Sequence, residues 1–402
     1  MKVRQELTAR EVDELHASLM RRIGDTTIPT LPQVAVKIIE LMGNQNATLQ
    51  QFADVIKTDQ ALTGRLLRLA NSAMFAQRQP VTQLHRAMVL MGMEKLKAIA
   101  LGFHLSKAMA ADDGPFSLRR VWTQSLFRAW LALHIVETID KKISGEAFIV
   151  GLLSDAGMSA MAKLAGPEFV AAINGADTPS RQFLDELRKL PFTHVDASAV
   201  LCRVWKLPAM LARPISMHHT PARSVAASDP ASVLHATAYY VGSLSLDAEG
   251  NHPSVAQLPE LADRYFGIDP DGMVDLIRKA SDAFKATREL FAHMIDPHLS
   301  VESIVEQANG QVSPISDDDS LPVEPEDEGE RFHAEGLVYE FHRGPDRCVT
   351  AYISDEEGNR LVAEQIDPRA HNEKRIRELL LLETADPAEV RRIMNGIRAL
   401  AA

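Results

Sequence analysis

An acidic, proline-rich stretch at residues 313–330 divides this sequence into two parts of different character. The stretch contains many acids, three prolines and no basic residue. Such a composition cannot bury enough apolar surface to fold, so we expect a solvated, extended linker. Before it, apolar residues recur at helical spacing, whereas after it they alternate with period two. We therefore predict a helical domain at residues 1–310, a linker at 311–330 and a small α+β domain at 331–402.

The composition favours packed helices for the larger part. Hydrophobic residues make up 46% and charged residues 24% of the chain, which is ordinary for a globular protein. Aromatic residues reach only 5%, and β-sandwich strands need more aromatic and β-branched residues than that. A break at residues 112–117 separates two expected helical subdomains, about 1–111 and about 118–310. The predicted fold class is thus mainly α, with a small α+β domain at the C-terminal end.

Charge and cysteine usage restrict the partners and the compartment. The formal net charge of -11 argues against general binding to nucleic acid or to an anionic membrane. Cys202 and Cys348 are far apart and form no metal-binding spacing, which suits a reducing cytoplasm. The first residues lack the apolar core of a signal peptide, and we expect no stretch of the roughly 18 apolar residues that span a membrane. We predict a cytoplasmic protein.

Four motifs follow one another in the N-terminal part. They are Leu31-Pro32-Gln33-Val34, Asp59-Gln60-Ala61-Leu62, the run from Arg65 to Ala73, and the run from Ala87 to Gly92. In this order they resemble the signature of the HDOD domain, the HD-related output domain of bacterial signalling proteins. The resemblance covers roughly residues 15–300 and implies an all-helical fold. Within the motif, Asp59, Asn71 and Ser72 are typical of helix caps and turns, which we favour over ligand contacts.

The stretch from Ala147 to Met161 suggests the floor of a site. An apolar run leads into one carboxylate, Asp155, between two nearby glycines. It resembles Gly-Leu-Leu-His-Asp-x-Gly, the core motif of the HD superfamily of metal-dependent phosphohydrolases. In that superfamily the His-Asp pair holds a metal that activates water. Here the histidine position is Ser154, and a hydroxyl is a poor ligand for a divalent transition metal.

The other ligand positions that the resemblance implies are partly kept and partly lost. The segment around Trp122 resembles Trp-x-His-Ser, and Leu234–Tyr239 resembles Val-His-x-Ala-Asp. The resulting vestigial HD-type site comprises Gln124, Ser154, Asp155, His194, His218, His219 and Ala238. With three ligands replaced, we predict no catalytic residue, no metal and no cofactor. The remaining three histidines and one carboxylate could still bind zinc if they converge, which the sequence does not reveal.

The function most consistent with such a site is a non-catalytic bacterial signalling or scaffolding module that acts through protein–protein interaction. The alternatives are a metal-dependent phosphohydrolase or cyclic-dinucleotide phosphodiesterase, and a nucleotide sensor that uses the emptied pocket. The replaced ligands, and the absence of Gly-Tyr-Pro after His219, count against the enzymes. In the non-catalytic account Gln124 and Ser154 donate hydrogen bonds to Asp155, and the helices around Asp59–Ser72 contact protein partners. The C-terminal domain is small enough to need docking or homodimerisation.

Overall fold

The structure is a computed structural model. It describes residues 4, 7–25, 32–42, 44, 46–75, 79–109, 117–173, 176, 178–222, 225–244, 258–296, 330–334, 337–343, 349–355, 360–366, 368–369, 373, 376–377, 380, 382 and 386–401.

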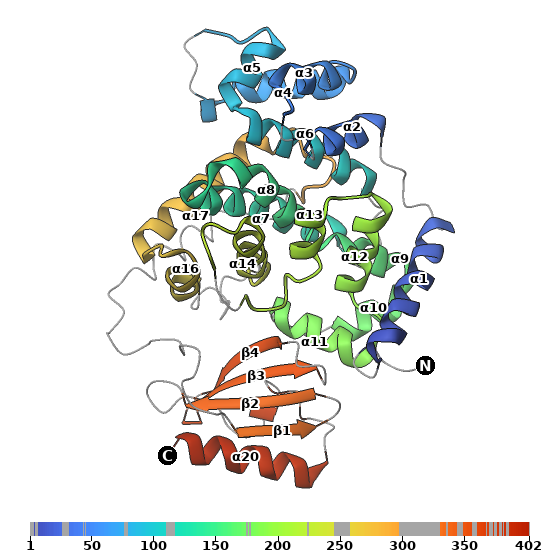
Figure 1. The fold of residues 1–402 in the computed structure, drawn as a ribbon, viewed down its shortest axis with the longest axis vertical. Coiled ribbons are helices and arrows are strands. Elements are labelled where there is room, and N and C mark those ends of the chain that lie inside the picture. The colour runs from blue at the N-terminus through green and yellow to red at the C-terminus, as the bar shows by residue number, and fades with distance from the viewer. Residues whose placement is uncertain are drawn as a thin grey trace.

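Of the first helices, α2 to α6 gather at one end of the helical part, whereas α1 lies against α12 (His194–Val204) (Figure 1). The first helices are α1 (Ala9–Asp25), α2 (Gln33–Met42), α3 (Leu49–Ile56), α4 (Gln60–Ala70), the short η2 (Ala73–Phe75), α5 (Leu84–Met91) and α6 (Met93–Met109). A capping box precedes α1, since the Thr8 amide donates to the Glu11 carboxylate at 3.0 Å and the Glu11 amide donates to the Thr8 hydroxyl at 3.4 Å. Asp59 caps α4 by accepting from the Leu62 amide at 2.9 Å. Side-chain caps therefore fix where these helices begin.

The second group of helices surrounds α7 and α8 (Figure 1). Its members are α7 (Leu118–Ile139), η3 (Lys141–Ile143), α8 (Ser144–Leu153), α9 (Ala156–Leu164), α10 (Gly166–Ile173), α11 (Pro179–Lys189), α12 (His194–Val204), α13 (Ala209–Ile215), α14 (Pro230–Gly242), α16 (Leu258–Phe266) and α17 (Pro270–Thr287). Helices α7 and α8 form the most extensive helix pair. A Cβ on Gly151 would lie 2.9 Å from the Arg128 carbonyl oxygen, so glycine is what allows α8 to approach α7 this closely.

One segment is long and apolar enough to cross a membrane by composition, contrary to the sequence expectation. It runs from Lys141 to Leu164, and 83% of its most apolar window is buried inside the protein. The high hydropathy of this segment is accounted for by its place in the helical core, where α8 is covered by its neighbours. No other candidate span occurs among the described residues.

The C-terminal part contains a four-stranded antiparallel sheet in the order β1-β2-β3-β4. The strands are β1 (Glu330–Ala334), β2 (Leu337–Arg343), β3 (Val349–Asp355) and β4 (Arg360–Ile366), and α20 (Pro387–Ala401) packs on the sheet. Tyr339, Phe341 and Ile353 meet Ile393 and Ile397 in one buried cluster. Strand β1 begins at Glu330, the last residue of the expected linker. The helices and this sheet together confirm the predicted mainly α fold with a small α+β part.

Two expectations fall on residues outside the described set. They are the linker from residue 311 to residue 329 and most of the break expected at 112–117. Four buried clusters occur within the described residues, three in the helical part and one around the sheet. The division into domains at residues 310 and 331 stays a prediction.

Candidate metal centre

Four of the residues named from the sequence converge at one buried point. Asp155 lies at the turn between α8 and α9, and His194 is the first residue of α12. His218 and His219 follow the end of α13. One ligand atom from each residue lies within 4.8 Å of the corresponding atoms of the others, and all four residues are buried. The sequence left zinc binding open on the condition that these side chains converge. In the structure they do converge.

The distances between the ligand atoms suit a small tetrahedral cation. The Nε2 atom of His194 lies 3.2 Å from the Nε2 atoms of both His218 and His219. Asp155 Oδ1 lies 3.2 Å from His218 Nε2 and 3.7 Å from His194 Nε2. In a tetrahedral zinc site with bonds of about 2.0–2.1 Å, neighbouring ligand atoms are about 3.3 Å apart. The distances from His194 to both other histidines and from Asp155 to His218 are thus close to those of a zinc-type ion, and all four atoms lie within 4.8 Å of one another.

Neighbouring groups turn two of the imidazoles toward that point. His194 Nδ1 lies 2.7 Å from a carboxylate oxygen of the buried Glu186, and His218 Nδ1 lies 2.8 Å from the Ile215 carbonyl oxygen. When Nδ1 donates to such an acceptor, the Nε2 lone pair of the neutral ring is left for a cation. The His219 ring stacks on Phe183, with ring centroids 4.6 Å apart and an angle of 4° between the rings. The rings are therefore held in place by groups outside the centre.

An arginine that the sequence analysis did not single out completes the centre. Arg128, on α7, is 2% exposed and donates from Nη1 to Asp155 Oδ2. Its Nε donates to the Leu244 carbonyl at 2.9 Å and its Nη2 to the Gly242 carbonyl at 3.2 Å. The sequence carried a signal for it, because Arg128 is a permanent charge inside the apolar run 126–133. A buried charge of this kind needs a partner of opposite sign.

The charges around the centre set the ionisation of its members. Burial opposes ionisation of Asp155, but Arg128 and His218 hold the pKa of that carboxyl well below its usual range. Burial would lower the pKa of His194, but Glu186 and Asp155 together raise it. Burial and the adjacent His218 lower the pKa of His219 well below its usual range. These directions favour an ionised Asp155 and a neutral His219, the forms that bind a metal, whereas the raised pKa of His194 favours a proton that a bound metal would have to displace.

The other predicted site residues lie around this centre without joining it. The Ser154 hydroxyl donates to the Val150 carbonyl at 2.8 Å, so the expectation that Ser154 supplies a hydrogen bond to Asp155 is wrong. A serine in a helix readily returns its hydroxyl to the carbonyl four residues earlier. Gln124 lies on α7, one helical turn before Arg128. Ala238 is buried in α14, and its methyl side chain has no polar atom that could bind a metal. The ion pair that Asp155 needed comes from Arg128 instead.

The N-terminal motif residues flank α4, since Asp59 directly precedes this helix and Asn71 and Ser72 directly follow it. Asn71 donates from its side chain to the Leu67 and Val81 carbonyls at 2.8 and 2.9 Å. It also accepts from the Val81 amide at 2.7 Å, so it ties the end of α4 to the segment before α5. Ser72 Oγ is buried without a hydrogen-bond partner in the described part of the chain.

Comparisons with known proteins agree with this architecture. Residues 28–221 match the family model of the HDOD domain. An uncharacterized protein of Treponema pallidum (strain Nichols) is 25% identical over 213 residues, which are 52% of this chain and 40% of that protein. The chain therefore spans less than half the length of this relative.

Two solved structures resemble the fold. One is an HDOD domain protein with unknown function from Geobacter sulfurreducens, at a TM-score of 0.52, 22% identity and coverage of 69% of this chain and 98% of that one. The other, from Marinobacter aquaeolei VT8, carries a provisional assignment to signal transduction. It has a TM-score of 0.54, 19% identity and coverage of 72% of this chain and 67% of that one. At these identities the likeness concerns the fold.

Proposed function

Because this chain contains an HDOD domain at residues 28–221, we propose that it is a non-catalytic signalling module whose HD-type site has become a structural centre. In this proposal the centre joins α7, the α8–α9 turn, α12 and the segment after α13. Output to other proteins then passes through the outer surface of the domain. The provisional assignment of the Marinobacter aquaeolei protein to signal transduction is in line with this proposal.

The observation that carries the proposal is the guanidinium of Arg128 on Asp155. A hydrolytic metal site keeps coordination positions open for water and substrate. Here one oxygen of Asp155 is held by Arg128, and the other faces His218 and His194. Three imidazoles and this second oxygen together supply four ligands, which complete a tetrahedral ion of the structural type. The three positions at which the HD-type motifs would supply further metal ligands carry Gln124, Ser154 and Ala238 instead.

The donor set still fits one divalent cation, and four residues would hold it. They are Asp155, His194, His218 and His219, and Glu186 would orient His194 from outside. When bound, such an ion supplies charge and crosslinks three helical segments, and it would stabilise the folded domain because the unfolded chain has no such site. Arg128 holds Asp155 in the ionised form whether or not an ion is bound.

The burial of the centre also argues against catalysis. The side chains of Asp155 and His194 are 5% and 0% exposed, so a phosphodiester could reach them only after the surrounding helices had separated. Asp155 also cannot act as a general base, because its pKa is held well below the usual range by Arg128 and His218 against the effect of burial.

The proposal is tested by an assay for phosphodiester hydrolysis on the full chain. Protein saturated in turn with zinc, manganese and iron(II) is incubated with bis(p-nitrophenyl) phosphate and with a cyclic dinucleotide. We expect no turnover above that of the matched variant His194→Ala/His218→Ala, which lacks two of the donors. Metal-dependent turnover that this double variant abolishes would refute the proposal and support the phosphohydrolase alternative.

A further inference from the structure

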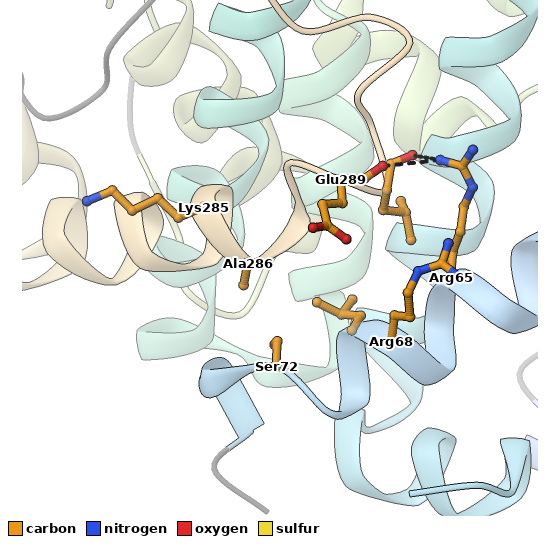
Figure 2. A pocket seen from close by; sticks show the side chains of 8 residues that line it. Arg65, Arg68, Ser72, Lys285, Ala286 and Glu289 are labelled. Atoms are coloured by element: carbon orange, nitrogen blue, oxygen red, sulfur yellow. Dashed lines mark hydrogen bonds between the residues drawn. The ribbon is translucent and has the colours of Figure 1, made fainter. Parts of the chain in front are cut away.

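A second site lies away from the histidine cluster, where α4 meets the end of α17 (Figure 2). The cavity there has a volume of about 260 Å³. Its lining consists of Arg65, Arg68, Leu69, Ser72, Lys285, Ala286, Glu289 and Leu290. Pockets for drug-sized ligands usually measure about 300–1,000 Å³. The occupant must therefore be small.

Two arginines one helical turn apart give the cavity its positive character. Figure 2 shows Arg65 and Arg68 projecting from α4 toward the end of α17, whereas the Lys285 side chain extends away from the cavity. Arg68 is exposed and has no ion-pair partner among the residues that the structure describes. Glu289 is the carboxylate of the lining, and it too has no ion pair within the described part of the chain. The chain as a whole carries a net charge of -11, so this positive character is local.

Arg65 is held in a fixed position before any ligand arrives. Its Nη1 donates to the carbonyls of Glu289 and Leu290 at 3.3 and 2.6 Å. Its guanidinium carbon also lies 5.1 Å from the centre of the Phe103 ring, within the range of a cation–π contact. A guanidinium anchored on one side can present its remaining N–H groups to an oxyanion at little entropic cost.

Positive charge extends beyond the lining of the cavity. The His293 ring lies edge-on to Phe103, with ring centroids 5.7 Å apart. Burial lowers the pKa of His293 to about 4, and the charges of Arg65, Lys107 and Arg119 add to that effect. These cations favour an anion over a cation in this region.

We infer that the cavity between α4 and α17 binds the phosphate group of a small phosphorylated molecule. The phosphate oxygens lie on Arg65 and Arg68, since planar guanidinium groups match oxyanions with paired hydrogen bonds. The apolar side chains of Leu69, Ala286 and Leu290 receive the organic part. Because α4 carries the N-terminal motif, this site gives the signalling domain a place to sense a metabolite.

The test is isothermal titration of the full chain with two probes, inorganic phosphate and glycerol 3-phosphate. We expect saturable binding of one molecule per chain. Arg68→Ala should weaken binding at least about tenfold, because a charged hydrogen-bond partner is lost. Arg203→Ala, at an exposed arginine on α12, is the matched control and should leave the affinity unchanged. Glu289→Gln should tighten binding, because it removes the one carboxylate of the lining.

A second readout distinguishes this site from diffuse attraction to surface cations. Saturation with phosphate should raise the pKa of His293, followed by NMR, because a bound anion offsets the charge of Arg65. Tighter binding of glycerol 3-phosphate than of phosphate supports a phosphorylated metabolite, and equal binding supports free phosphate as the source of the group. The inference is overturned if neither probe binds below about 10 mM, or if Arg203→Ala weakens binding as much as Arg68→Ala.

Discussion

Replacing Arg128 by methionine should destabilise the domain strongly, because the substitution leaves the buried Asp155 carboxylate without its cation. Arg128 is 2% exposed, and it donates to Asp155 and to the carbonyls of Gly242 and Leu244. Removing one partner of a buried ion pair costs about 3–5 kcal/mol. At about 2–4 °C per kcal/mol, the expected fall in Tm is roughly 6–20 °C. That cost is a large part of a typical unfolding free energy of about 5–15 kcal/mol.

A double variant tests whether the unpaired Asp155 carboxylate causes this loss of stability. In Arg128→Met/Asp155→Asn the second substitution removes the unpaired charge, so the double variant should be more stable than Arg128→Met alone. Thermal unfolding is measured by circular dichroism on the parent, both single variants and the double variant. All four are treated with a chelator first, so that the loss of a metal ligand does not contribute. A Tm of Arg128→Met within about 2 °C of the parent, or a double variant less stable than Arg128→Met, would refute the reasoning.

Three further changes test other parts of the structure. Burial and then Glu94 raise the pKa of Glu146 from 4.5 to about 7, so the folded state binds this proton more tightly than the unfolded chain does. Stability should then fall by up to about 3 kcal/mol as pH rises from 4.5 through 7, and Glu146→Gln should remove this slope in urea titrations across that range. A Cβ on Gly157 would lie 1.9 Å from the His194 carbonyl oxygen. Gly157→Ala should therefore lower the free energy of unfolding in urea by about 3 kcal/mol. It should also weaken zinc binding in a competition assay, because the clash displaces His194. Asn71→Ala removes three hydrogen bonds and should cost about 1–3 kcal/mol in the same unfolding assay, and an unchanged midpoint would contradict that role.

The helices of the larger part could be predicted because each carries its own start signal and apolar face. Asp59, which the sequence marked as a helix cap, does cap α4. Strand β1 was missed because Glu330–Ala334 directly follows the acidic stretch and has few apolar residues. Its place in the sheet comes from pairing with β2, which is a non-local property.

The site was predictable as a set of residues and not as a geometry. Asp155 and the three histidines stand out by their motifs, but their convergence depends on how α8, α12 and α13 pack. Ser154 was expected to contact Asp155, yet a helical serine has a nearer acceptor in the Val150 carbonyl. Arg128 lies 27 positions before Asp155, and no spacing rule connects them. The signal in the sequence was the cost of its burial, which requires an anion nearby.

X-ray absorption at the zinc edge, on the full chain loaded with one equivalent of zinc, measures whether the centre is closed. A centre closed by Asp155, His194, His218 and His219 has no position for catalytic water. The spectrum should show four nitrogen or oxygen ligands at about 2.0–2.1 Å, with the scattering pattern of three imidazoles. Five or six ligands, or fewer than three imidazoles, would show an open or different site and would contradict the account.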